Sequence, residues 1–351
     1  MSDAVSSITN YELRIMSTRI AIVRSLPGLG DLLCAVPAWR SLRAALPEAQ
    51  VTLIGLPWAR TFVERFSHYL DDFLEFPGYP GIPEVSPPFT KLPEFLTTVQ
   101  QQRFDLALQM HGSGIVSNQF TVLLGARVNA GFYLPDQYCP DADRFLPYPA
   151  HEPEVWRHLR LMEFLGIPLQ GDVLEFPLSE SDFSALHTIQ EVRHLQAGEY
   201  VCVHPGASVR DRCWSPEKFA VVADALAARG FQVVLTGTAA EADLTKYVGE
   251  VMQARPIDLA GRTSLGAIAA LLSTARLLVC NDTGVSHLAA ALRVKSVVIF
   301  SASDPKRWAP LDRDRHRIVS SSVSTITPDT VLSQVANLLS KETTGVMEIF
   351  I

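Results

Sequence analysis

An aspartate ends a glycine-rich turn near the amino terminus, in the segment GLGD (28–31). The turn follows an apolar, β-branched run, RIAIVR (19–24), and precedes a helical pattern that begins at Leu32. A carboxylate held on such a turn could accept a proton from a substrate hydroxyl and act as a general base. The alternative is that Asp31 is the N-cap or a first-turn acid of the helix, where the helix dipole favours a negative charge.

A second turn offers groups that bind phosphate. Asp282, Thr283 and Gly284 stand between an apolar run and a helical pattern. A glycine turn at the start of a helix exposes backbone N–H groups that can donate to phosphate oxygens. The pattern therefore favours a phosphate-binding turn, against the alternative of an ordinary strand-to-helix connection. His287 follows one helical turn later, either as a packed polar residue or as a donor that lines the pocket.

The sequence lacks several common catalytic motifs. After GLG, Leu33 takes the place of the third glycine of a dinucleotide fingerprint, so a nicotinamide enzyme is disfavoured. The motifs GxxxxGK[ST], GxSxG and HExxH do not occur, and phosphate-loop NTPases, common serine hydrolases and zincins are not indicated. We interpret His151 and His158 as surface residues rather than as a metal site. The five cysteines form no CxxC pair, which fits a reduced cytoplasm better than disulfides or structural zinc.

Alternating strand and helix patterns position these residues. Strands are predicted at 19–24, 51–56, 71–76, 105–110, 199–206, 231–237, 257–261, 276–282 and 295–301, and helices at 32–46, 59–66, 91–102, 113–125, 152–166, 215–230, 240–252, 264–275, 283–292 and 328–342. Strands that alternate with helices predict parallel sheets wound on both faces, and such sheets bind ligands at the carboxyl ends of their strands.

The order of these patterns predicts two α/β domains. A polar stretch over 179–198 separates the halves, so we expect an amino-terminal domain over 18–180 and a carboxyl-terminal domain over 181–351, facing a central cleft. Residues 1–17 are interpreted as a flexible tail. The proline-rich segment 77–93 is expected to form a surface loop, because proline does not fit a long helix or a central strand.

The composition limits the partners of the chain. Its 30 basic and 37 acidic residues give a net charge of −7, which disfavours a general electrostatic interaction with nucleic acid. No stretch approaches the roughly 20 apolar residues that span a bilayer, and the amino terminus has no signal-peptide core. Any anion must therefore be bound by local groups.

The sequence resembles glycosyltransferase family 9, the group that contains the ADP-heptose:lipopolysaccharide heptosyltransferases. The matching blocks are LPGLGDLLCAVPAWRSLR, VHPGAS with the following WSPEKF, LTGTAAEADL, DLAGRTSLGAIAALLSTARLLVCNDTGVSHLAAAL and SASDPKRWAPL. They cover most of residues 19–312, and the block with NDTGVSH is the most specific. The resemblance implies a GT-B architecture, in which two Rossmann-like domains face a cleft, and an inverting, metal-independent sugar transfer from a nucleotide-sugar.

The resemblance also implies roles in the amino-terminal domain. In the family, the acid that matches Asp31 deprotonates the acceptor hydroxyl, so Asp31 is expected to be the catalytic base. Gly30 beside it is an expected contact of the acceptor or sugar. His111, which follows the strand pattern at 105–110, is either such a contact or a plain turn histidine.

The carboxyl-terminal domain is implied to bind the donor. Family members commonly have a lysine two residues before the tryptophan that matches Trp214, and this chain has Arg212 there. Arginine stays cationic and can donate two parallel hydrogen bonds to phosphate, so we expect Arg212 to act on the leaving diphosphate. Arg210 is an alternative cation, Ser208 an expected hydroxyl donor, and both arginines could instead be solvated. Glu241 is expected to accept from the ribose hydroxyls or to be a first-turn helix acid.

These features predict a cytoplasmic glycosyltransferase without metal or cofactor, with transient contact to the inner membrane surface. It would move a sugar, best matched by heptose, from a nucleoside-diphosphate sugar to a lipopolysaccharide-type or other glycan or glycolipid acceptor. Two alternatives stay open: a nucleotide-sugar epimerase of similar two-domain fold, and a non-catalytic nucleotide-sugar binding module. No nucleic-acid partner is expected.

Overall fold

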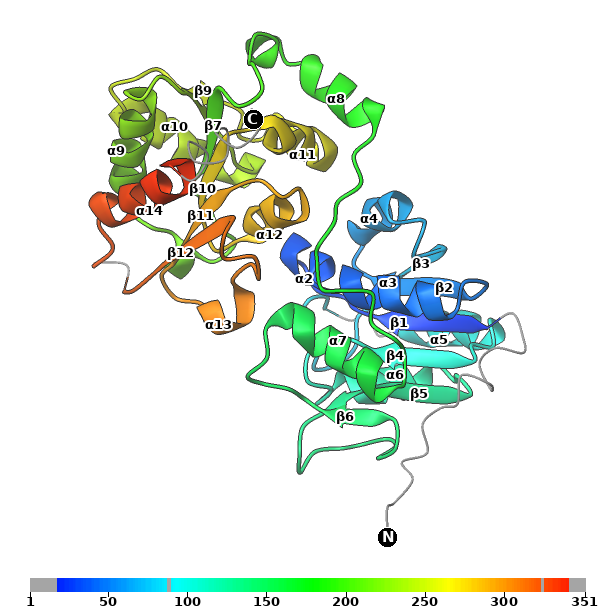
Figure 1. Cartoon of the computed structure of the whole chain (residues 1–351). Coiled ribbons are helices and arrows are strands. Elements are labelled where there is room, and N and C mark those ends of the chain that lie inside the picture. Colours follow the sequence, from blue (N-terminus) through cyan, green and yellow to red (C-terminus); the bar gives the residue numbers. More distant parts are fainter. Residues whose placement is uncertain (1–17, 87–89, 323–324, 341–351) are drawn as a thin grey trace, which may run out of the picture. The chain divides into compact units, whose positions relative to one another are not determined.

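The chain divides into two compact units in the computed structural model (Figure 1). The described residues are 18–86, 90–322 and 325–340. The units are Met1–Val173 and Leu174–Ile351, so the division falls a few residues before the boundary that the sequence predicts at 180. The expected flexible tail, 1–17, lies outside the described residues.

The amino-terminal unit contains a parallel six-stranded sheet in the order β3-β2-β1-β4-β5-β6. Its strands are β1 (Arg19–Val23), β2 (Gln50–Gly55), β3 (Asp72–Glu75), β4 (Leu106–Gln109), β5 (Val128–Tyr133) and β6 (Phe145–Pro147). β1 pairs with both β2 and β4, so the strand order reverses between β1 and β4, where ligands of such sheets bind. The four strands that the sequence predicts here are confirmed. β5 was not predicted because Asn129 and Gly131 interrupt its apolar pattern, and β6 was not predicted because it has only three residues.

Helices cover both faces of this sheet. α3 (Val36–Ala45), α4 (Ala59–Arg65) and α7 (Glu154–Phe164) pack together on one face. α5 (Lys91–Gln101) and α6 (Ser117–Leu123) lie on the other, over a core that includes Ala21 and Val23 of β1. Because side chains alternate along a strand, the buried Ile20 and Ile22 point to the opposite face, which α3, α4 and α7 cover. Burial on both faces explains why the central strands are almost wholly apolar.

The single helix predicted over 32–46 is two helices in the structure. α2 (Leu29–Leu33) ends before a break at Cys34 and Ala35, and α3 then begins at Val36 with Pro37 in its first turn. Proline has no N–H and its ring clashes with the carbonyl four residues before it, which here belongs to Leu33. The break leaves α2 as a short turn of helix that carries the GLGD aspartate.

The proline-rich segment is not simply a surface loop. Its first part packs against the core under α5 and α6, where Ile82 is buried and Tyr79 and Val85 are partly buried. The Ile82 N–H donates to the Tyr79 carbonyl at 2.9 Å, which folds the segment back on itself. The predicted loop is confirmed for this part, and its apolar side chains between the prolines and glycines additionally pack on the core. Residues 87–89 lie outside the described residues.

The carboxyl-terminal unit repeats this architecture with the strand order β12-β11-β10-β7-β8-β9, again parallel throughout. Its strands are β7 (Tyr200–His204), β8 (Gln232–Leu235), β9 (Ile257–Asp258), β10 (Leu277–Asn281), β11 (Ser296–Phe300) and β12 (His316–Ser320). The strand order reverses between β7 and β10. The five strands predicted in this half are confirmed, and β12 was missed because arginine and histidine interrupt its apolar pattern.

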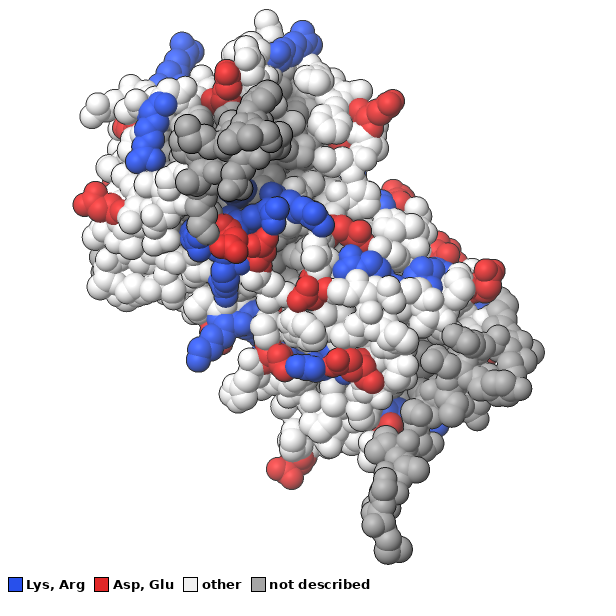
Figure 2. Space-filling model, in the orientation of Figure 1, with Lys and Arg blue, Asp and Glu red and all other residues white. Residues whose placement is uncertain are grey.

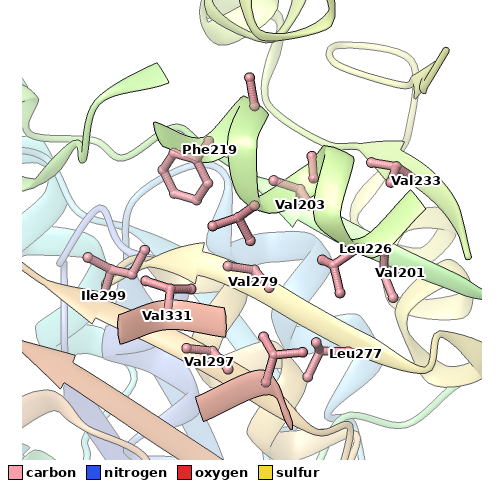
Figure 3. Packing of buried hydrophobic residues seen from close by; sticks show 14 of the residues in the cluster. Val201, Val203, Phe219, Leu226, Val233, Leu277, Val279, Val297, Ile299 and Val331 are labelled. Carbon is pink, nitrogen blue, oxygen red and sulfur yellow. The ribbon is translucent and has the colours of Figure 1, made fainter. Parts of the chain in front are cut away.

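Two layers of helices also enclose the second sheet (Figure 1). α9 (Pro216–Ala227), α10 (Ala242–Val251) and the terminal helix α14 (Pro328–Ser340) lie on one face, and α11 (Leu265–Thr274) and α12 (Gly284–Ala291) on the other. Figure 3 shows Val203, Val279 and Ile299 of neighbouring strands packed with Phe219 of α9 and Val331 of α14. The terminal helix therefore completes the core of the second unit.

The polar stretch that separates the halves also contains structure. α8 (Glu180–His187) packs against α11, and a 3-10 turn, η1 (Gln190–Val192), follows it. α8 begins with a capping box in which the Ser179 N–H donates to the Asp182 carboxylate at 2.9 Å. The S-x-x-D pattern is the sequence signal that could have predicted this helix start.

Within the described ranges, no helix is long and apolar enough to cross a membrane. On the face shown in Figure 2, acidic and basic side chains are interspersed and much of the area carries neither.

Candidate active site

Asp31 lies half-buried in the first turn of α2, at the carboxyl end of β1. Gly28 is the N-cap of this helix, and its carbonyl accepts the Asp31 N–H at 3.1 Å. A Cβ on Gly28 would overlap the Asp31 carboxylate, which therefore lies directly over this glycine. Asp31 is thus a first-turn acid, and its role as a base stays a prediction. Gly30 is buried, and its carbonyl accepts the Cys34 N–H at 2.9 Å.

A fully buried arginine holds the Asp31 turn in place. Arg24 Nε and Nη2 donate to the Asp31 carbonyl at 2.9 and 2.5 Å, and Nη1 donates to the Met110 carbonyl at 2.5 Å. Arg24 Nη2 also lies 3.5 Å from Glu154 Oε1, and the same buried carboxylate pairs with Arg157 Nη1 at 3.0 Å. Sequence reasoning missed Arg24, although a charged residue at the end of an otherwise apolar strand is a signal for such a role.

His158 belongs to the same buried cluster, so its interpretation as a surface residue is wrong. Its side chain is 3% exposed, with Nε2 at 3.5 Å from Glu154 Oε1. Burial first, and then Arg24, lowers the pKa of His158 to about 4. His151 is exposed and precedes α7, so the two histidines do not share a helix. The face of α7 that carries His158 is covered because it packs within the unit.

His111 follows β4 and lies close to the Asp31 turn, so its predicted place at the carboxyl end of the sheet is confirmed. The Ser25 N–H donates to His111 Nδ1 at 3.3 Å, and Ser25 Oγ lies 3.2 Å from the same nitrogen. Because Nδ1 accepts, a neutral ring carries its proton on Nε2. Burial first, and then Arg24, lowers the pKa of His111 to about 4. His111 is therefore a neutral Nε2–H donor at pH 7.

The second candidate turn has the predicted strand-turn-helix geometry. Thr283 is the N-cap of α12, with an extended backbone (φ −155°, ψ 174°), and Thr283 and Gly284 are both half-buried. The first N–H groups of a helix have no partner inside it, so this helix start can donate to phosphate. Asp282 and His287 are buried, and the His287 ring lies 6.1 Å from that of Trp308, which follows in α13 (Pro305–Trp308).

The loop between β7 and α9 brings Arg212 to this turn. Arg212 ends a 3-10 turn, η2 (Arg210–Arg212), and its Nη1 lies 3.9 Å from Asp282 Oδ2. The Ser303 hydroxyl donates to the same Asp282 oxygen. Arg212 is one-third exposed, which leaves its guanidinium accessible to a ligand. Arg210 and Ser208 are exposed on the same loop.

Buried Asn281 fixes this loop to the end of β10. Its Oδ1 accepts the Trp214 N–H at 3.0 Å, and its Nδ2 donates to the Pro205 carbonyl at 2.7 Å. Both ends of the loop are thereby tied to the residue that precedes Asp282. Sequence reasoning did not single out Asn281, although it opens the block NDTGVSH.

Glu241 ends the 3-10 turn η3 (Ala239–Glu241) after β8 and closes its capping box. Its Oε2 accepts the Thr238 N–H at 2.7 Å and the Thr238 hydroxyl at 2.9 Å. The expected alternative of a first-turn acid is therefore confirmed. The carboxylate also lies over Gly206, where a Cβ would overlap Oε1. Oε2 lies 3.8 Å from Nε2 of His204, whose pKa burial lowers.

The titratable side chains do not gather into a metal centre in the described part of the chain. Among those residues, no group of three or more His, Cys, Asp or Glu could hold a metal ion. The candidate cluster in the amino-terminal unit is Asp31 beside the neutral His111. The candidate cluster in the carboxyl-terminal unit is Arg212 with Asp282 and the start of α12.

Two Rossmann-like doubly wound sheets in tandem define a GT-B architecture. The sequence model described as glycosyltransferase family 9 (heptosyltransferase) matches residues 94–337. This match covers more than half of the chain, and the chain therefore belongs to glycosyltransferase family 9. The fold class and the family expected from the sequence are both confirmed.

Individual relatives are similar over different lengths. Lipopolysaccharide heptosyltransferase 3 of Escherichia coli is 34% identical over 125 residues, which are 34% of this chain and 37% of the relative, so the match spans about a third of each. Lipopolysaccharide heptosyltransferase 2 of Salmonella typhimurium is 24% identical over 346 residues, 90% of this chain and 97% of the relative. The structure of the ADP-heptose lipopolysaccharide heptosyltransferase II of E. coli superposes with a TM-score of 0.71 at 21% identity, covering 93% of this chain and all of that one.

Proposed function

We propose that this chain transfers a heptose from a nucleoside-diphosphate heptose, best matched by ADP-heptose, to a hydroxyl of a lipopolysaccharide-type acceptor. The observation that carries the proposal is the placement of Asp31 at the carboxyl end of β1, on a turn held by buried Arg24. The family and the names of its relatives support the substrate classes. Because the acceptor is a glycolipid, we further propose that the reaction takes place at the cytoplasmic surface of the inner membrane.

The proposed step is a single displacement at the anomeric carbon. The acceptor oxygen forms a bond to that carbon while the bond to the diphosphate oxygen breaks, and Asp31 takes the proton of the acceptor hydroxyl. Attack opposite the leaving group inverts the anomeric configuration. Asp31 is half-buried at the carboxyl end of β1, which is where parallel sheets of this kind bind their ligands.

The groups proposed for the donor stabilise the charge that develops on the diphosphate. Arg212 and the N–H groups at the start of α12 would donate to its oxygens, and this set supplies the stabilisation without a divalent metal. Exposed Arg210 and Ser208 would add contacts from the same loop. Glu241 Oε2 is used by the capping box, and the remaining lone pairs of the carboxylate would accept hydrogen bonds from the ribose hydroxyls.

The test replaces Asp31 by asparagine, which keeps the shape of the side chain but cannot accept the proton. With ADP-heptose and a core-truncated lipopolysaccharide as substrates, we expect kcat to fall about 100-fold or more, the usual contribution of a general base. The Kd for ADP, measured by calorimetry, should change less than twofold. Wild-type turnover in the Asp31→Asn variant would remove the assignment of the base.

Three further readouts separate the proposal from its alternatives. A glycosylated acceptor supports transfer, an isomerised sugar nucleotide formed without acceptor indicates an epimerase, and donor binding without any product indicates a binding module. Activity that survives EDTA supports the metal-independent mechanism, and activity that EDTA abolishes contradicts it. A thermal-shift screen of ADP-, UDP- and GDP-sugars identifies the base, because a ligand that binds only the folded chain raises its melting temperature.

A further inference from the structure

The folded part of the proline-rich segment places a second carboxylate beside the Asp31 turn. Glu84 follows Ile82, whose burial anchors the segment to the core. The Glu84 side chain is 14% exposed, and its Oε2 lies 3.7 Å from Nε2 of His111. This distance is too long for a hydrogen bond between the two atoms, so neither group satisfies the other.

The surroundings of Glu84 are unusual for a purely structural acid. Its Oε2 is buried and accepts no hydrogen bond from any of the described residues. Burial raises the pKa of Glu84, its backbone hydrogen bond lowers it, and the nearby charge of Asp31 raises it further. A buried acceptor without a donor, close to another acid, destabilises the free protein and calls for a functional explanation.

We propose that Glu84 and His111 form a hydroxyl-binding pair that recognises the acceptor sugar next to the proton acceptor Asp31. This inference rests on the proposed glycosyl transfer. One sugar hydroxyl would donate to Glu84 Oε2 and accept from the Nε2–H of His111, because a hydroxyl can do both at once. The Ser25 N–H fixes the histidine tautomer that this requires.

The pair also determines which groups are rejected. A phosphate or carboxylate substituent at the bound position would meet the negative charge of Glu84 and could not donate to it. A missing hydroxyl would leave both Glu84 and the His111 N–H without a partner in a buried place, which is costly. The site is therefore specific for an unsubstituted hydroxyl, and it orients the neighbouring hydroxyl toward Asp31.

The experiment compares Glu84→Ala and Glu84→Gln with a matched control, Glu94→Gln, which changes an exposed acid on α5. Initial rates are measured with core-truncated lipopolysaccharide at saturating ADP-heptose, together with the Kd for ADP and the melting temperature. We expect Glu84→Ala to raise the acceptor KM about 10-fold or more, as for a lost hydrogen bond to a charged group. Glu84→Gln should give a smaller rise, because its amide oxygen still accepts. The ADP Kd should stay within twofold, and the control should match wild type.

Acceptor analogues add a readout that a structural role would not change. Synthetic core fragments that each lack one hydroxyl are tested with wild type and Glu84→Ala. One analogue should lose its rate with wild type yet show little additional loss with the variant, because the hydroxyl and Glu84 act as a pair. Equal sensitivity of every analogue to Glu84→Ala contradicts the pairing.

The outcomes separate this inference from the proposed function. A Glu84→Ala variant that melts as wild type does and keeps its acceptor KM within twofold overturns the inference alone. If that variant does not fold, Glu84→Gln decides by the same criterion. A wild-type chain that binds ADP but transfers no sugar overturns the proposed function and this inference with it.

Discussion

The carboxylate of Asp31 occupies the space that a side chain on Gly28 would need. Gly28 has an ordinary extended backbone, with φ at −88° and ψ at 134°, which any residue can adopt. The glycine is therefore required by the position of the carboxylate and not by the backbone. A substitution there should move Asp31 while the turn itself stays folded.

Gly28→Ala should lower kcat by roughly 100-fold, because a carboxylate displaced by about 1 Å no longer meets the acceptor hydroxyl correctly. The melting temperature should change little, since the Asp31 side chain can rotate away. Steady-state rates for the single variant and for Gly28→Ala with Asp31→Asn test the cause. In the Asp31→Asn background the alanine should have almost no effect, and a full additional loss would contradict the explanation.

Gly206→Ala should weaken the binding of ADP, because its methyl group would overlap the Glu241 carboxylate. We expect the Kd for ADP to rise about 10-fold, on the scale of one lost hydrogen bond to a charged group. Calorimetry with inorganic pyrophosphate provides the control, since this ligand has no ribose for Glu241 to hold. Equal losses for ADP and pyrophosphate would show that Gly206 acts on the phosphate site instead.

Arg212→Ala should lower kcat by about 100-fold, the effect of removing one donor to a developing negative charge. The side chain lies beside the turn that begins with Asp282, whereas Arg210 is exposed. Arg210→Ala alone should therefore cost less than tenfold. Rates of both single variants and of the double variant are compared. Normal turnover in the double variant would mean that other groups neutralise the diphosphate.

Arg24→Lys should both destabilise the amino-terminal unit and impair turnover. Lysine keeps the charge beside Glu154 but cannot donate to the Asp31 and Met110 carbonyls together. We expect a loss of about 1 to 3 kcal/mol of stability and a tenfold or greater fall in kcat with an unchanged acceptor KM. Arg24→Met, which removes the donors to both carbonyls and leaves Glu154 paired with Arg157, should be less stable still. A parallel rise in acceptor KM would indicate general disruption of the domain instead of misplacement of Asp31.

His158 should make the amino-terminal unit sensitive to acid. Its pKa in the folded chain is lowered to about 4 from 6.5, so below pH 6.5 the unfolded chain binds a proton that the folded chain does not. Stability is therefore complete above pH 6.5 and is lost as the pH falls toward 4, by roughly 3 kcal/mol at about 1.4 kcal/mol per pKa unit. Melting temperatures at pH 7.5 and 5.0 should differ less in His158→Leu than in wild type. Exposed His151→Gln is the control and should keep the wild-type difference.

The sequence predicted the elements that depend on local patterns. Apolar β-branched runs predicted the central strands, and glycine turns followed by helical patterns predicted where Asp31 and Thr283 stand. Buried parallel strands need continuous apolar runs, and a helix start needs a cap, so both are visible in the residues themselves. Edge strands such as β6 and β12 carry a weaker pattern because less of their surface is buried.

The family was also evident from the sequence. The matching sequence blocks extend over most of the chain, and their glycines, acidic residues and basic residues follow one another in the same order as in the family. What only the tertiary structure decided is which distant residues meet. Glu84 and His111 are far from Asp31 in the chain, and their proximity to it follows from the strand order that places β4 beside β1 and from the folding of the proline-rich segment onto the core. Burial, which sets the pKa of His111 and His158, is likewise a property of packing and not of any local pattern.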